Sequence, residues 1–194
     1  MNLNQMDYLL KHSLKPGRYI HSVNTMKEAL SLAAHYGEDC ERAAIAGLIH
    51  DCAKELSDEE TLEYCRKHGI ELSELEKRQV FLMHGEVGAI IARDKYDVID
   101  EAVLKAVRYH TTGCSEMSML DKIIFLADYI EPGRKHSEVD NVRKLAYVNI
   151  NKALISAFDS IIKYVIDQKG LIHPDTIEAR NAIYMILSDN NTDL

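Results

Sequence analysis

The chain has 194 residues, a length that suits one domain, and 46% apolar and 28% charged residues are ordinary for a globular protein. A net charge of −8 argues against nonspecific nucleic-acid binding, which needs lysine and arginine to displace counterions from phosphates. No apolar run approaches the roughly 20 residues of a membrane helix, and the N-terminus lacks a signal peptide's apolar core. The four cysteines form no CxxC pair, so a cytoplasmic protein with free thiols and no membrane partner is expected.

Helical periodicity recurs along the chain, and no segment alternates for long in the manner of a half-buried strand. The first expected helix covers residues 22–36, whose apolar stripe is followed by Gly37, a residue suited to the left-handed end of a helix. The segment from 39 to about 53 is nearly apolar. It therefore predicts a helix buried at the centre of the fold.

Two capping boxes mark the beginnings of further helices, because a serine is followed three residues later by a glutamate at Ser57–Glu60 and at Ser73–Glu76. The remaining helices are expected at 84–96, 100–110, 118–130, 139–147, 149–168 and 174–188. No internal repeat or long linker interrupts the series. The sequence predicts an all-α fold, a single compact bundle of about nine helices.

Two acidic residues interrupt apolar helical segments. His50-Asp51 lies in GLIHDCAK, where an unpaired ionised aspartate would be costly to bury. A cation bound by both side chains would compensate; an Asp51–Lys54 ion pair or a histidine hydrogen-bonded in the core are the alternatives. Asp128 repeats the anomaly in the apolar run MLDKIIFLADYIEP. One cation shared by Asp51 and Asp128 explains both buried carboxylates more economically than two separate compensating partners.

Three further histidines are candidates for the same site. His21, expected at the head of the first amphipathic helix, supplies another nitrogen ligand. Imidazole and carboxylate together suit iron, manganese, cobalt, nickel or zinc rather than calcium. His84 is expected to open a helix and His110 to end one, positions from which both could face a substrate or a second metal. A capping or surface role is the alternative for these two.

The order of these residues resembles a known superfamily, the HD-domain phosphohydrolases. The positions that carry this likeness are, in order, His21, His50-Asp51, His84, His110 and Asp128. Seven consecutive motifs are also similar to those of the YqeK family: RYIH, GLIHDCAK, HGEVGA, RYHTTG, ADYIEPGR, VDNVRKLA and IHPDTIEARN. That family is known as a symmetrical diadenosine tetraphosphate hydrolase. The resemblance spans about 18–181, nearly the whole chain.

The resemblance implies a cofactor, a substrate site and a domain plan. The cofactor would be iron, or manganese, cobalt or another divalent transition metal, as one or two ions held by His21, His50, Asp51 and Asp128. The nucleotide would be bound by Arg18, Lys54, His84, Tyr109, His110, Arg134, Thr176 and Arg180. A metal-binding core over about 18–131 would be joined by a C-terminal helical part, about 137–190, that completes the nucleotide pocket.

The implied reaction is cleavage of a dinucleoside tetraphosphate, such as diadenosine tetraphosphate, into two nucleoside diphosphates by metal-activated water. Asp51 would bind metal and orient the water, and His84 or His110 would protonate the departing phosphate oxygen. Two hypotheses compete: an HD-type enzyme acting on another nucleotide, and a non-catalytic nucleotide-binding regulatory module. A homodimer is the default expectation, because two-fold dimers are the commonest assemblies.

Overall fold

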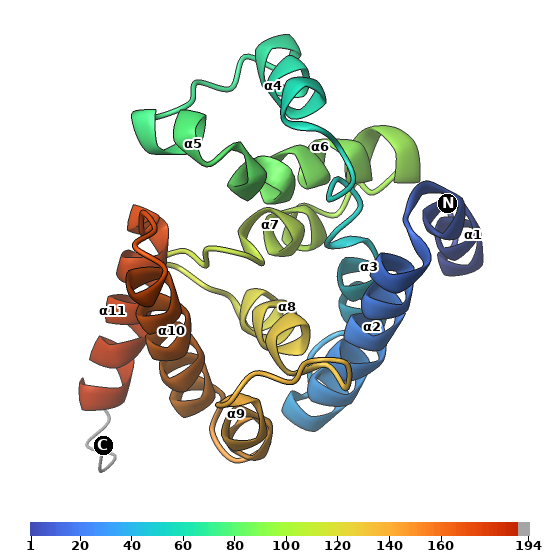
Figure 1. Ribbon diagram of the computed structural model, residues 1–194. Helices are drawn as coiled ribbons and strands as arrows, with labels where there is room; N and C mark the ends of the chain where they lie inside the picture. Colours follow the sequence, from blue (N-terminus) through green and yellow to red (C-terminus); the bar gives the residue numbers. More distant parts are fainter. Residues whose placement is uncertain (190–194) are drawn as a thin grey trace.

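The computed structural model describes residues 1–189, which contain eleven α-helices and one 3₁₀ helix joined by turns and loops (Figure 1). In chain order they are α1 (Leu3–Ser13), α2 (Pro16–Tyr36), α3 (Cys40–Ile49), α4 (Asp58–Lys67), α5 (Glu74–Arg78), η1 (Val80–Met83), α6 (His84–Tyr96), α7 (Glu101–Tyr109), α8 (Met119–Ile130), α9 (Val139–Ala146), α10 (Ile150–Asp167) and α11 (Pro174–Asp189). No strand occurs within these residues, so the all-α prediction is confirmed. None of the described helices is long and apolar enough to cross a membrane.

Helix α8 lies at the centre of the arrangement and packs against α2, α3, α7, α9 and α10 (Figure 1). Its sequence is nearly all apolar, and Ile123, Ile124 and Leu126 are completely buried. Burying a side chain of this size stabilises a fold by about 1.5–3 kcal/mol. Asp128 stands near the end of this central helix, so the surrounding core fixes its position.

The predicted helix ends are confirmed where a local signal marked them. Gly37 caps α2 in the left-handed conformation, with φ of 70°. Ser57 and Ser73 open α4 and α5 with complete capping boxes. Pro174 is the first residue of α11, where its missing N–H is not needed. The end of the expected C-terminal part, residue 190, lies just outside the described residues.

The described residues contain slightly more helices than the nine or so predicted, and part of the difference lies at the N-terminal end. Helix α1 was not expected, although a complete capping box of Asn2 and Gln5 opens it and Met6 and Leu10 are buried on one face. Helix α2 begins at Pro16 rather than at residue 22, with proline in its first turn. His21 is therefore in the second turn of α2 and not at its head.

The expected helix over 39–53 is also shorter than predicted, because α3 ends at Ile49. The His50 ring donates to the carbonyl oxygen of Gly47 at 2.8 Å, the acceptor that residue 51 would use in a continuing helix. The chain continues in tighter turns, with the N–H of Cys52 bonded to the oxygen of Ile49. Asp51 thus lies just beyond the helix, on a turn facing the core.

Gly85 allows α6 to approach the backbone at the end of α7. A Cβ atom at this position would overlap the backbone oxygen of Arg108. The close approach brings the first residue of α6, His84, to 3.1 Å from His110, measured between the two Nε2 atoms. Gly85 is therefore needed for the geometry of the site as well as for packing.

We expect Gly85→Ala to lower the free energy of unfolding by about 1–3 kcal/mol, because α6 must move away from α7. Chemical denaturation measures the change. Gly17→Ala is the matched control, since Gly17 is also helical and an added Cβ would meet nothing within 4 Å. Alanine is the better helix former, so this control should be neutral or slightly stabilising. Equal behaviour of the two variants would contradict the packing argument.

Candidate metal centre and active site

Four histidines and two aspartates meet where α2, α6 and α8 converge with the ends of α3 and α7. The cluster consists of His21, His50, Asp51, His84, His110 and Asp128. All but Asp128 are at most 9% exposed, and Asp128 is half-buried. The structure thus brings together the predicted metal ligands and the predicted catalytic residues.

Asp51 stands between two pairs of histidines, His21 with His50 and His84 with His110. Its Oδ2 lies 3.6 Å from the Nε2 atoms of both His21 and His50. Its Oδ1 lies 3.3 Å from Nε2 of His84 and 3.5 Å from Nε2 of His110. One carboxylate therefore faces two pairs of imidazoles, one pair with each oxygen.

Asp128 lies beside the pair formed by His21 and His50. Its Oδ1 lies 3.0 Å from Nε2 of His21 and 3.8 Å from Nε2 of His50. The two imidazole nitrogens are themselves 3.2 Å apart. Three donor atoms from three segments thus converge on one point.

Local backbone contacts fix which nitrogen of each imidazole faces the cluster. In three cases Nδ1 lies within hydrogen-bond distance of the carbonyl oxygen three residues earlier: His50 with Gly47 at 2.8 Å, His84 with Phe81 at 2.6 Å and His110 with Val107 at 2.7 Å. A carbonyl oxygen can only accept, so each Nδ1 carries a proton and donates it. Nε2 is therefore the nitrogen that each ring directs at the cluster, and it is the atom through which the ring would bind a metal.

His21 is oriented instead by Glu131, a buried carboxylate that the sequence reasoning missed. Glu131 is 3% exposed, and its Oε1 lies 3.2 Å from Nδ1 of His21. It also accepts from Asn24 Nδ2 at 3.1 Å and from the N–H of Gly133 at 2.6 Å. No local signal marked it, because an acid directly before Pro-Gly resembles an ordinary helix end.

The donor set fits a divalent transition metal. Lone pairs of neighbouring imidazoles and carboxylates repel one another unless a cation or a proton lies between them. Nitrogen and oxygen donors of this kind suit iron, manganese, cobalt or zinc. Two ligand sets, each with its donor atoms within 4.8 Å of one another, share Asp51: His21, His50 and Asp51 form one, and Asp51, His84 and His110 the other.

Both aspartates are held in the ionised form. Burial by itself would raise the pKa of Asp51, but positive charge on His50 and hydrogen bonds from the facing imidazoles lower it well below its usual range. Burial opposes ionisation of Asp128 too, yet a hydrogen bond from His21 and the charges of His50 and Arg134 lower its pKa. A bound metal would supply the same compensation in place of protonated imidazoles.

Burial lowers the pKa of His84 to about 4, with the charges of His110 and Lys54 acting in the same direction. His84 is therefore neutral near pH 7. A neutral imidazole suits the role of a ligand or hydrogen-bond acceptor better than that of a proton donor. Thr111, also missed in the sequence, places its Oγ1 3.0 Å from Nε2 of both His84 and His110.

Two cations flank the cluster near Asp51. Arg18 donates from Nη1 to Oδ2 of Asp51 at 2.9 Å. Lys54 lies with its Nζ 3.1 Å from Nε2 of His84. Asp51 thus forms its ion pair with Arg18 rather than with Lys54, the partner that the sequence offered as an alternative.

A third cation, Arg134, lies beside Asp128. Its Nε donates to the backbone oxygen of Asp128 at 2.8 Å, and its Nη2 pairs with the Asp128 carboxylate. The turn that carries Arg134 is held by Arg143, which donates to the backbone oxygens of Glu131 at 2.8 Å and Arg134 at 3.0 Å. Arg143 lies in VDNVRKLA, and the sequence alone offered no reason to single it out.

The other predicted substrate residues do not join the cluster. Tyr109 is the last residue of α7, with the guanidinium of Arg108 5.2 Å from its ring centroid. Thr176 is buried in the first turn of α11. Arg180 donates to Asp159 at 2.8 Å, on the α10 face of α11.

Comparison with known proteins agrees with this geometry. Residues 18–133 match the family model described as HD domain. A symmetrical bis(5'-nucleosyl)-tetraphosphatase of Halalkalibacterium halodurans is 36% identical over 95% of this chain and 98% of its own length. The corresponding protein of Bacillus subtilis is 36% identical over 93% and 97%.

A solved structure shares the fold. It is described as a predicted HD superfamily hydrolase involved in NAD metabolism from Clostridium acetobutylicum. The TM-score is 0.93 at 46% identity, over 96% of this chain and 98% of that one. The chain therefore belongs to the HD-domain family, among the symmetrical bis(5'-nucleosyl)-tetraphosphatases that it matches over nearly its whole length.

Proposed function

We propose that this chain is a metal-dependent phosphohydrolase that cleaves dinucleoside tetraphosphates at the centre, releasing two nucleoside diphosphates. The observation that carries the proposal is the position of Asp51, with imidazoles facing both of its oxygens and Arg18 beside it. The substrate class is that of the two bis(5'-nucleosyl)-tetraphosphatases to which the chain is similar. A non-catalytic module has no need for so complete a set of ligands.

A divalent transition metal supplies Lewis-acid chemistry when bound, because it activates water as a nucleophile and offsets charge on a phosphoryl oxygen. The chain's own cations do the rest of the electrostatic work. Arg18, Lys54 and Arg134 would bind the phosphoryl oxygens on which negative charge grows, where most phosphoryl-transfer catalysis lies. A guanidinium carries five N–H donors, so Arg18 and Arg134 can bind phosphate while retaining their aspartate partners.

We propose iron as the resident metal, with manganese or cobalt able to replace it, since the donors are imidazole and carboxylate. His110 is the better candidate to protonate the departing phosphate oxygen, because His84 is held neutral by burial. The C-terminal helices would complete the nucleotide site. Thr176, buried in the first turn of α11, would contribute to that site.

We expect purified protein supplied with ferrous iron to convert diadenosine tetraphosphate into ADP alone, and a chelator to abolish the reaction. Chromatographic separation of the nucleotides measures the products. AMP and ATP together would overturn central cleavage while leaving a hydrolase. No turnover, with metal shown to be bound, would favour another nucleotide as the substrate.

A further inference from the structure

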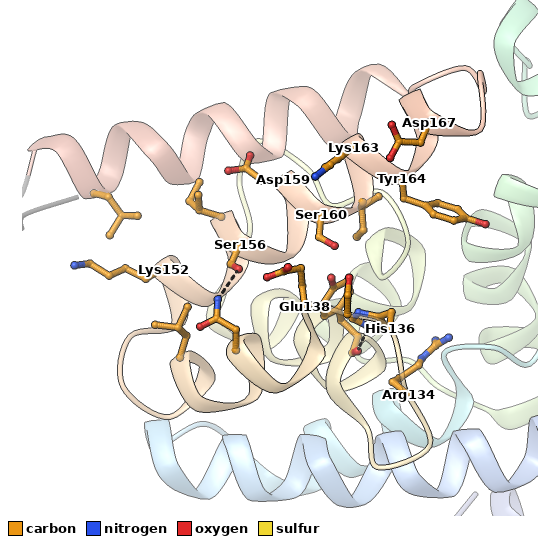
Figure 2. Close-up of a pocket in the computed structure, with 17 residues that line it drawn as sticks. Arg134, His136, Glu138, Lys152, Ser156, Asp159, Ser160, Lys163, Tyr164 and Asp167 are labelled. Carbon is orange, nitrogen blue, oxygen red and sulfur yellow. Dashed lines mark hydrogen bonds between the residues drawn. The ribbon is translucent and has the colours of Figure 1, made fainter.

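A large cavity opens between α10 on one side and α9 with residues 131–138 on the other (Figure 2). Its volume is about 1030 Å³, at the upper end of the range of roughly 300–1,000 Å³ for small-molecule sites. None of the cluster residues lines it. The cavity is therefore a separate space with room for a ligand of nucleoside size.

Arg134 connects this cavity to the cluster. Its side chain lines the cavity, while its guanidinium is bonded to Asp128. The side chain is 37% exposed, so part of its donor capacity is free for a ligand. The cavity thus begins one arginine side chain away from a predicted metal ligand.

The charges around the cavity are balanced. Three cationic side chains, Arg134, Lys152 and Lys163, face three acidic ones, Glu138, Asp159 and Asp167. A polyphosphate needs an excess of cations, which this lining does not offer. The lining as a whole suits a neutral polar group, and phosphate is favoured only at the Arg134 end.

The walls carry the groups that recognise a nucleoside. Tyr164, with 66% of its surface exposed, lies at the same end as Arg134 and offers a ring on which a base can stack (Figure 2). Ser160 and Glu138 point into the gap from opposite walls, where they can bond to ribose hydroxyls or base edges (Figure 2). Ile155 and Ile161 add apolar surface.

A dinucleoside tetraphosphate that is cut at its centre carries a nucleoside on both sides of the reacting phosphates. The two nucleosides must therefore extend from the cluster in different directions. The second nucleoside needs a binding site of its own, and that site must begin at the cluster. On the basis of the proposed function, we propose that this cavity binds the second nucleoside, with Arg134 holding phosphate at its entrance.

Two variants test the cavity through the KM for diadenosine tetraphosphate. Tyr164→Ala removes the stacking ring, and Ser160→Phe fills the space between the walls. We expect each to raise the KM about tenfold, the value of one base–aromatic stack, with the effect in KM rather than kcat. Tyr8→Ala is the matched control, because Tyr8 is 64% exposed on α1, outside this cavity, and its KM should stay at the wild-type value.

Calorimetric titration with ADP tests the same site without turnover. We expect two ADP molecules to bind each wild-type chain and one to bind Ser160→Phe. One ADP per wild-type chain, or an unchanged KM in Tyr164→Ala, would overturn the inference. If Ser160→Phe fails to fold, the surface variant Tyr164→Ala decides. If the wild type does not cleave diadenosine tetraphosphate, the proposed function fails on its own and the ADP stoichiometry still tests the cavity.

Discussion

Replacing Asp51 by asparagine is expected to reduce kcat for diadenosine tetraphosphate by at least about a thousandfold and to weaken metal binding. Both carboxylate oxygens face imidazole Nε2 atoms, at 3.3–3.6 Å. Asparagine keeps one oxygen, without its charge, and directs an N–H₂ donor at the other pair of rings. Initial rates and calorimetric metal titration measure the two effects.

Asp94→Asn is the control for this variant, because Asp94 is exposed on α6 and contacts none of the cluster residues. It should retain full turnover. Circular dichroism should show that Asp51→Asn keeps its helices, since the change removes a buried charge without removing volume. If Asp51→Asn turned over at the wild-type rate, the metal-dependent mechanism would be wrong.

Replacing Glu131 by glutamine is expected to weaken metal binding about tenfold, and replacing it by alanine about a hundredfold. Glutamine retains an acceptor for the Nδ1–H of His21 but loses the negative charge that makes this ring a stronger ligand. Alanine also leaves the buried donors of His21, Asn24 and Gly133 without an acceptor. Its free energy of unfolding should fall by about 3 kcal/mol. Metal titration and denaturation measure these changes.

The comparison that isolates the role of Glu131 is Glu63→Gln, an exposed glutamate on α4. It should bind metal with wild-type affinity. If glutamine and alanine at position 131 lowered stability but left metal affinity unchanged, Glu131 would be a packing residue only. The orientation of His21 would then have another cause.

Local signals in the sequence predicted most of the helices and the two aspartates of the cluster, and the resemblance to the HD superfamily added its four histidines as a set. Asp51 and Asp128 could be identified because a charge inside an apolar run needs compensation, wherever its partner lies. Glu131 could not, because its partner His21 is 110 residues away and its own position before Pro-Gly resembles an ordinary helix end. Helix α1, in contrast, does carry a local signal, the capping box of Asn2 and Gln5, which the sequence reasoning passed over.

The cavity proposed as the second nucleoside site could not be predicted from the sequence either. The cavity beside Arg134 is formed by α9, α10 and the segment between α8 and α9. Its lining residues, such as Ser160 and Tyr164, lie on ordinary amphipathic helices and break no local rule. Only the packing of these helices leaves a space between them.

The hydrogen bonds from the rings of His50, His84 and His110 to the backbone bear on how the protein acquires its metal ion. Each ring is oriented within four consecutive residues, so folding alone places the ligands before any ion arrives. Arg18 steadies Asp51 in the meantime. We therefore expect a chain that has lost its ion to keep its fold and to bind an ion again without refolding. Because imidazole and carboxylate accept several transition metals, the supply of ions in the cell helps to decide which one the enzyme carries.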